Sequence, residues 1–313
     1  MDQTNMTAIT HFIIVGFSDL PVLRVPIFLL VLLIYLITIG GNLTILILVC
    51  VDHRLHNPMY FFLANLSLAD ISCSTIALHK VLVTFIFGYN TISVLGCLIQ
   101  ILIYLSLLCD KLLILTAMSY DHFVAICNPL QYHIVMNHKV CIILATACWI
   151  WGFLESLPIF IELLGFTCYK SCKINHFFCD IVPLRKLSCN DTHVLELYIL
   201  VVGMLIATFT PFLLTFISYI FIISTILGFR SVSERHKAFY TCSSHLTVVI
   251  LLYSSLIFQY VTPQSFVNLD LNKYFSLFNV AMVPILNPLI YSLKNKDVKA
   301  ALGRRLTWLT TNK

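Results

Sequence analysis

Long apolar runs, separated by short polar segments, follow one another along most of the chain. Seven of these runs have about the 20 residues that an α-helix needs to cross roughly 30 Å of hydrocarbon. None alternates apolar and polar residues with the period of two that barrel strands show. The pattern therefore predicts an all-α membrane protein, a seven-transmembrane helix bundle. The predicted spans lie at about 25–50, 58–86, 96–122, 140–161, 196–226, 238–261 and 272–293.

The spans divide the chain into an N-terminal segment, residues 1–24, a seven-transmembrane domain, residues 25–293, and a tail, residues 294–313. The first residues lack the charged, apolar and cleavage regions of a removable signal peptide, so we expect the first run to stay as a span. In the tail, basic residues accompany Val298, Leu302 and Leu306, which are spaced four residues apart. This predicts a short amphipathic helix on the inner membrane surface, and no cysteine is available there for palmitoylation. Four prolines fall inside spans and predict kinks: Pro158, Pro211, Pro284 and Pro288.

Composition excludes the main soluble classes. Hydrophobic residues make up 59% of the 313 positions, charged residues only 11%, and the mean hydropathy is +0.94. A soluble domain carries roughly 25% charged residues, so lipid is the expected surroundings. The net charge of +5 is too small and too scattered for nucleic-acid binding. Enzymes are disfavoured because the chain contains no Gly-x-Ser-x-Gly, His-Glu-x-x-His or Gly-x-Gly-x-x-Gly motif.

The distribution of basic residues predicts the orientation of the bundle. An odd number of spans places the termini on opposite sides, and cytoplasmic loops carry the excess of Lys and Arg. The side that includes the C-terminus has eleven such residues and the other side has six. We therefore expect a plasma-membrane protein with an extracellular N-terminus and a cytoplasmic C-terminus. Asn5, in the sequon Asn5-Met6-Thr7, would then be a glycosylation site.

The twelve cysteines are unevenly placed. Most lie in apolar runs, but Cys168, Cys172, Cys179 and Cys189 crowd one polar stretch on the predicted outer side. Such crowding is typical of disulfides in an oxidising compartment. With His176, these cysteines also have the chemistry of metal ligands, an alternative that oxidation of the thiols disfavours.

Four motifs in four spans point to a family. They are Leu-His-Asn-Pro-Met-Tyr-Phe-Phe-Leu at 55–63, Met-Ser-Tyr-Asp-His-Phe-Val-Ala-Ile-Cys at 118–127, Lys-Ala-Phe-Tyr-Thr-Cys-Ser-Ser-His-Leu at 237–246 and Pro-Ile-Leu-Asn-Pro-Leu-Ile-Tyr-Ser-Leu at 284–293. In this order the motifs closely resemble the olfactory (odorant) receptors, a branch of the rhodopsin-like G-protein-coupled receptors. The resemblance covers nearly the whole chain.

The resemblance implies a small hydrophobic odorant as ligand, a heterotrimeric G protein of the stimulatory olfactory type as partner, and no cofactor or metal. It implies a disulfide between Cys97 and Cys179 and a second bond from Cys189 to either Cys168 or Cys172. Residues matching the family's activation and coupling positions are Asn42, Asp70, Lys111, Asp121, His122, Tyr219, Asn287, Pro288 and Tyr291. The polar core among them is interpreted as a network that repacks on activation, with static hydrogen bonding between helices as the alternative.

Two of these positions depart from the family pattern. Lys111 stands where the family usually has an acid, which predicts an ion pair with Asp70; neighbouring Asp110 or a water cavity is the alternative partner. His122 replaces the arginine of Asp-Arg-Tyr, and a histidine offers fewer donors and no permanent charge. A weakly coupling or non-signalling receptor is therefore an alternative function, as is a receptor for a non-odorant small molecule.

Family position also implies a ligand pocket in the outer half of the bundle, lined by apolar side chains with a few hydroxyls and without a carboxylate at its centre. Such a lining suits a ligand held by shape and by one or two hydrogen bonds. The expected lining residues are Tyr104, Leu105, Leu108, Cys109, Gly203, Met204, Ala207, Thr208, Tyr253, Leu256, Ile257, Tyr260 and Leu277.

Two other membrane-protein classes fit less well. A transporter or channel predicts paired repeats or polar broken helices, and we find neither in the sequence. A light-driven pump with a Schiff base needs a lysine midway along the seventh span, and the seventh span has none there.

Overall fold

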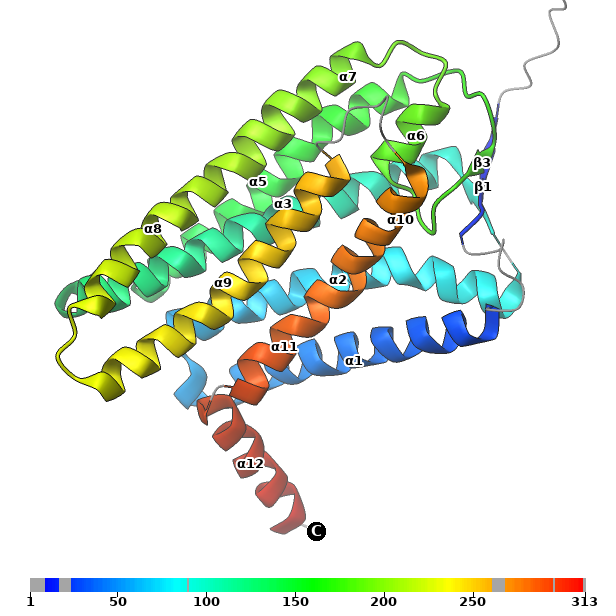
Figure 1. The fold of residues 1–313 in the computed structure, drawn as a ribbon. Helices are drawn as coiled ribbons and strands as arrows, with labels where there is room; N and C mark the ends of the chain where they lie inside the picture. The colour runs from blue at the N-terminus through cyan, green and yellow to red at the C-terminus, as the bar shows by residue number, and fades with distance from the viewer. Residues whose placement is uncertain (1–8, 17–23, 89, 261–267, 295, 312–313) are drawn as a thin grey trace, which may run out of the picture.

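Seven long helices form a single bundle (Figure 1). The computed structural model describes residues 9–16, 24–88, 90–260, 268–294 and 296–311. Within them, seven helices are long and apolar enough to cross a membrane, which confirms the predicted fold class. The helices are α1 (Arg24–Val51), α2 (Pro58–Phe87), α3 (Val94–Cys127), α5 (His138–Leu164), α7 (His193–Tyr198) continued by α8 (Thr210–Leu227), α9 (Val232–Tyr260), and α10 (Leu269–Leu277) continued by α11 (Val283–Lys294).

The two ends of the bundle differ in structure. One end carries a small sheet in which β1 (His11–Ile14) pairs antiparallel with β2 (Thr91–Ser93) and parallel with β3 (Lys173–Ile174). We call this the sheet end, and the short helix α6 (Ile181–Leu187) lies there too (Figure 1). The opposite end carries α12 (Lys296–Thr311), and we call it the α12 end. Three short helical segments complete the chain: His53–Leu55, Pro129–Gln131 and α4 (Tyr132–Val135).

Local sequence signals set where several helices begin and end. Asn57 caps α2, because its Oδ1 accepts the backbone N–H of Tyr60 at 3.2 Å. Ser93 and Asn137 cap α3 and α5 in the same way, through bonds of 3.1 Å. Polar side chains at this position satisfy N–H groups that the first helical turn leaves free. Gly88 ends α2 with a φ of 72°, a left-handed conformation that glycine adopts without strain.

Two prolines are preceded by π-helical stretches. Residues Ile199–Phe209, before Pro211, and Phe278–Met282, before Pro284, both widen their helices. Proline has no N–H group, so a carbonyl one turn earlier loses its usual partner. In the first stretch, the hydroxyl of Thr208 donates to the carbonyl of Gly203 at 2.8 Å. This bond gives the Gly203 carbonyl a side-chain donor within the π-helical stretch.

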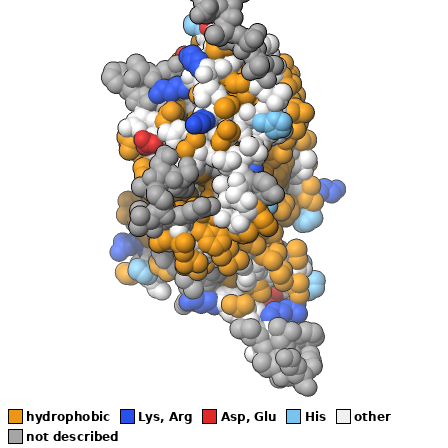
Figure 2. Space-filling model, turned by 90° about the vertical axis from the view of Figure 1, so that its right-hand side faces the viewer, with side chains coloured by type: hydrophobic (Ala, Val, Ile, Leu, Met, Phe, Trp, Pro, Cys, Tyr) orange, Lys and Arg blue, Asp and Glu red, His pale blue; other side chains and the backbone are white. Residues whose placement is uncertain are grey.

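The outer surface of the bundle is hydrophobic. Leu36, Ile143 and Phe216 each leave more than half of their area exposed, and many other apolar side chains do the same. Figure 2 shows a broad hydrophobic area with basic side chains mainly above and below it. A face of this extent suits lipid, because soluble proteins rarely expose contiguous apolar areas of more than a few hundred Å².

An ion pair fixes α12 to the first inter-helix turn. The Arg304 guanidinium donates to Asp52 Oδ2 from Nη2 at 2.6 Å and from Nε at 3.2 Å. The same contact holds the pKa of the Asp52 carboxyl below its usual range. A helix is therefore present in the tail where one was predicted, and Arg304, midway along it, ties it to the bundle.

Candidate functional site

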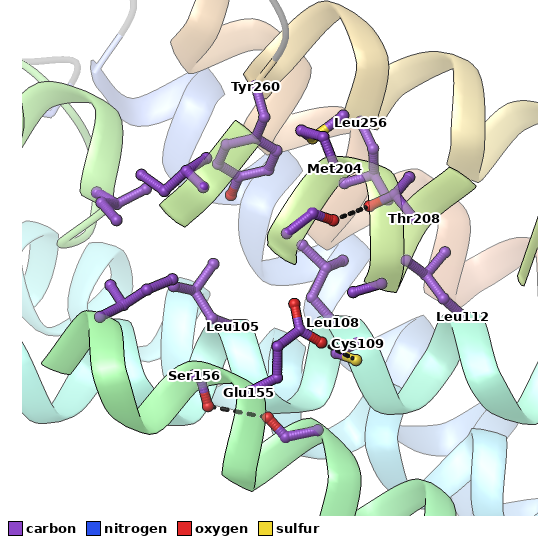
Figure 3. Close-up of a pocket in the computed structure, with 16 residues that line it drawn as sticks. Leu105, Leu108, Cys109, Leu112, Glu155, Ser156, Met204, Thr208, Leu256 and Tyr260 are labelled. Carbon is purple, nitrogen blue, oxygen red and sulfur yellow. Dashed lines mark hydrogen bonds between the residues drawn. The ribbon is translucent and has the colours of Figure 1, made fainter. Parts of the chain in front are cut away.

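A cavity of about 70 Å³ lies between α3, α5, the π-helical stretch before α8, and α9 (Figure 3). We call it the bundle cavity. Apolar side chains cover most of its wall, and α6 contributes Ile181 from the sheet end. Its lining comprises Leu105, Leu108, Cys109, Leu112, Gly152, Glu155, Ser156, Ile159, Ile181, Ile199, Gly203, Met204, Ala207, Thr208, Leu256 and Tyr260.

Nine of the expected pocket residues lie in this wall: Leu105, Leu108, Cys109, Gly203, Met204, Ala207, Thr208, Leu256 and Tyr260. The other four do not line it. Ile257 is 49% exposed on the outer face of α9, which corrects its assignment to the pocket. Tyr104 instead packs edge-on against Phe178, with ring centroids 4.8 Å apart. Tyr253 packs against Phe212, and Leu277 packs against the main core.

The expected lining had no carboxylate at its centre and did not include Glu155, but this carboxylate is part of the cavity wall. Glu155 of α5 projects into the cavity, and its Oε2 accepts a hydrogen bond from the Cys109 thiol at 2.8 Å (Figure 3). A charged residue inside a span usually faces the bundle interior, and Glu155 falls within the fourth predicted span. That rule, applied to every charge in the spans, could have identified it. No sequence signal of this kind marks the other missed residues, such as Ile181 and Ile199.

The predicted disulfide between Cys97 and Cys179 is present and ties the start of α3 to the loop before α6. Of the two alternatives for Cys189, the structure has the bond to Cys168. Cys172 is a free thiol, so its place among the disulfide residues is corrected. Two disulfides consume four thiols of this end, and no group of three or more metal-ligating side chains occurs among the described residues.

A buried polar cluster lies beside the cavity, next to Tyr260. Asp180, next to the disulfide, accepts a hydrogen bond from Gln259 Nε2 at 2.9 Å and one from Ser276 at 3.3 Å. Gln259 also donates to the hydroxyl of Tyr260, whose side chain lines the cavity. Burial raises the pKa of the Asp180 carboxyl. The loop, α9 and α10 are therefore linked through side chains beside the cavity.

The N-terminal strand covers this loop. The carbonyl of His176 accepts the N–H of Gly16 at 2.9 Å, and the imidazole packs against the rings of Phe177 and Phe178, which also contact each other. Burial, with a smaller effect of Lys273, lowers the pKa of His176 to about 3. The ring is therefore neutral and serves in packing at this end of the bundle.

Midway along the bundle, the predicted ion pair is present. Lys111 Nζ lies 3.2 Å from Asp70 Oδ1, and both side chains are almost fully buried. Asn287 donates to the other oxygen of Asp70. Asn42 bonds to the backbone of α11 through the carbonyl of Pro284 at 3.0 Å. These bonds link α1, α2, α3 and α11 in one polar core.

His122 lies in a second polar cluster, towards the α12 end. Its Nδ1 is 3.4 Å from the hydroxyl of Tyr219, which is in turn 2.8 Å from Nδ1 of His245. The two imidazole rings meet edge-on, with centroids 5.3 Å apart. Asp121 accepts a hydrogen bond of 2.8 Å from Tyr132 of α4. One tyrosine hydroxyl thus joins α3, α8 and α9.

Three predicted site residues remain: Pro288, Tyr291 and Asn5. Pro288 packs closely on α1, where a Cβ added at Gly41 would lie 2.8 Å from its ring. The side chain of Tyr291 and all of Asn5 lie outside the described residues.

Comparison with known proteins agrees with this architecture. A sequence profile described as olfactory receptor matches residues 31–308. The chain is 44% identical over 306 residues to olfactory receptor 5P76 of Mus musculus, covering 98% of this chain and 97% of that protein. It is also 44% identical over 306 residues to olfactory receptor 8K1 of Homo sapiens, covering 98% and 96%. These relatives are receptors and not enzymes. The chain therefore belongs to the olfactory receptor family, as a multi-pass membrane protein with seven membrane-spanning helices.

Proposed function

We propose that this receptor binds a small, largely hydrophobic odorant in the bundle cavity and activates a heterotrimeric G protein of the stimulatory olfactory type. The observation that carries the proposal is the cavity itself, walled by α3, α5 and α9 and closed by the disulfide-bonded loop. Family membership supports the same role. A second candidate, a receptor for a non-odorant small molecule, uses the same cavity and differs only in ligand.

Activation is proposed to occur by population shift. A ligand that fits the active bundle better than the inactive one moves the equilibrium by that difference in affinity. At about 70 Å³ the cavity is smaller than the 150 Å³ site that holds benzene in an engineered protein core, so ligand binding requires the wall to move. Tyr260 could transmit such a movement from the cavity wall to the loop and α10. Its hydroxyl is bonded to Gln259, which also binds Asp180 of the loop and Ser276 of α10.

The α12 end is proposed to face the cytoplasm and the G protein, with the sheet end outside the cell at the plasma membrane. The greater number of basic residues on the α12 side and the disulfides at the sheet end support this orientation. In this arrangement, His122 faces a buried tyrosine and presents no permanent charge at the inner end. That observation favours the alternative of weak coupling.

A cyclic-AMP reporter assay with an odorant panel tests the proposal. Wild type and His122→Arg are compared at matched surface expression. We expect agonist responses in both, with a larger maximal response in His122→Arg because arginine restores a charged, multi-donor group. If both proteins stay silent to every odorant while present at the surface, the signalling proposal is wrong. An unchanged maximal response in His122→Arg would contradict weak coupling alone.

A further inference from the structure

The carboxylate of Glu155 is the unusual group in the bundle cavity. It is the one charged side chain among the residues that line the cavity. Its Oε2 accepts the Cys109 thiol, a weak donor, and no partner is recorded for its Oε1 among the described residues. The salt bridges in the described part of the chain involve other acids: Asp70, Asp270 and Asp52.

The other polar side chains of the cavity wall already form hydrogen bonds within the protein. Ser156 donates to the carbonyl of Gly152 at 2.9 Å, and Thr208 donates to the carbonyl of Gly203 at 2.8 Å. Tyr260 bonds within the Asp180 cluster. A ligand that enters the cavity therefore finds hydrocarbon on most sides and, at Glu155, an acceptor with free capacity.

A carboxylate in such surroundings is costly unless a cation or several donors compensate it. Among the described residues, no lysine or arginine lines the cavity. We infer that the ligand itself supplies the cation, and that the bundle cavity recognises a small alkyl or cycloalkyl amine whose ammonium group donates to Glu155. This inference rests on the proposed ligand-binding role of the cavity and adds the chemical class of the ligand.

The geometry of the cavity fits both parts of such a molecule. Figure 3 shows the Glu155 carboxylate beside Leu108 and Cys109, with the Tyr260 ring on the opposite wall. The ammonium group would bind at the carboxylate, and the hydrocarbon part would extend towards the Tyr260 side of the cavity. Leu105, Leu256 and Met204 surround the remaining space and would contact the hydrocarbon part. Gly203 contributes no side chain, which leaves room on the α8 side.

Isosteric ligand pairs test the inference on the full-length receptor in lipid nanodiscs. Isobutylamine is compared with isobutanol, and cyclohexylamine with cyclohexanol, by the saturable shift of the thermal unfolding midpoint at pH 7. We expect each amine to bind at least 10-fold more tightly than its alcohol. In Glu155→Gln, amine affinity should fall about 10- to 100-fold, the range for losing a hydrogen bond to a charged group, while alcohol affinity stays the same.

Glu162→Gln is the matched control, because Glu162 lies on the same helix but does not line the cavity. It should keep the preference for amines. Unchanged alcohol binding shows that Glu155→Gln is folded. If that variant fails to fold, the comparison of amine with alcohol affinity in the wild-type receptor tests the inference by itself. Equal binding of amine and alcohol, no binding of either amine, or an amine preference that survives in Glu155→Gln would overturn the inference.

The cyclic-AMP assay separates this inference from the proposed function. Amine binding that depends on Glu155 in a receptor silent to every odorant supports the inference and contradicts signalling. Activation by alcohols, with amines inert in both assays, supports signalling and contradicts the amine site.

Discussion

At the scale of single residues, three charged or polar side chains inside the spans form the contacts on which our predictions rest. Lys111 places a covalently attached cation beside Asp70. His122 bonds to Tyr219 at the α12 end. Glu155 places a carboxylate in the bundle cavity. The sequence predicted the first pair through the family resemblance, because Lys111 stands where the family usually has an acid that can share a cation with Asp70.

The Lys111–Asp70 pair makes a testable contribution to stability. Lys111→Met removes the cation and leaves Asp70 buried beside Asn287 alone, so we expect the free energy of unfolding to fall by about 3–5 kcal/mol. Thermal unfolding of the purified receptor measures this loss. The double variant Asp70→Asn/Lys111→Met replaces the pair by neutral groups and should recover most of it. Equal stability of the single and double variants would show that the pairing contributes little.

At the scale of elements, close contact between helices depends on small residues and on the placement of prolines. Gly152 of α5 packs against α3, where an added Cβ would lie 2.5 Å from the carbonyl oxygen of Ser106. This contact brings Glu155 and Ser156 alongside α3, where they help to form the cavity. The π-helical stretch before Pro211 contributes Gly203 and Met204 to the opposite wall.

Gly152→Ala should therefore separate α3 from α5. Because the clash is with backbone and not with a flexible side chain, we expect a loss of about 1–3 kcal/mol in the free energy of unfolding and weaker ligand binding. Gly40→Ala of α1 is the control, since nothing lies within 4 Å of an added Cβ there. An alanine at that helical position should stabilise by about 0.5–1 kcal/mol. Similar unfolding midpoints for the two variants would contradict this account of the interface.

At the scale of the whole molecule, the two ends are built for different surroundings. The sheet end holds both disulfides and the strand β1 over the loop. The α12 end holds the Arg304–Asp52 pair and the greater share of basic residues. The apolar spans between them are long enough to cross a membrane, so the helices are expected to run across it. Either end could then face the cytoplasm.

The distribution of basic residues predicts one of these orientations, and an epitope experiment tests that prediction. A tag at the N-terminus should be stained on intact cells, and a tag at the C-terminus only after permeabilisation. Asn5→Gln should leave the staining unchanged and lower the apparent mass by one glycan. A second sequon, Asn190-Asp191-Thr192, lies on the same side, so some glycosidase sensitivity can remain. Staining of both tags on intact cells would refute the predicted topology.

The sequence by itself determined the seven spans, the family, the Cys97–Cys179 bond and the Asp70–Lys111 pair. The spans follow from hydrophobic length and the family from its four ordered motifs, while the disulfide and the ion pair are what the family resemblance implies. Tertiary structure decided which thiol pairs with Cys189 and which side chains face the cavity, because both depend on helix rotation and loop path. Leu256 and Ile257 show the difference: they are neighbours in one apolar run, and only packing turns the first to the cavity and the second to the outer face.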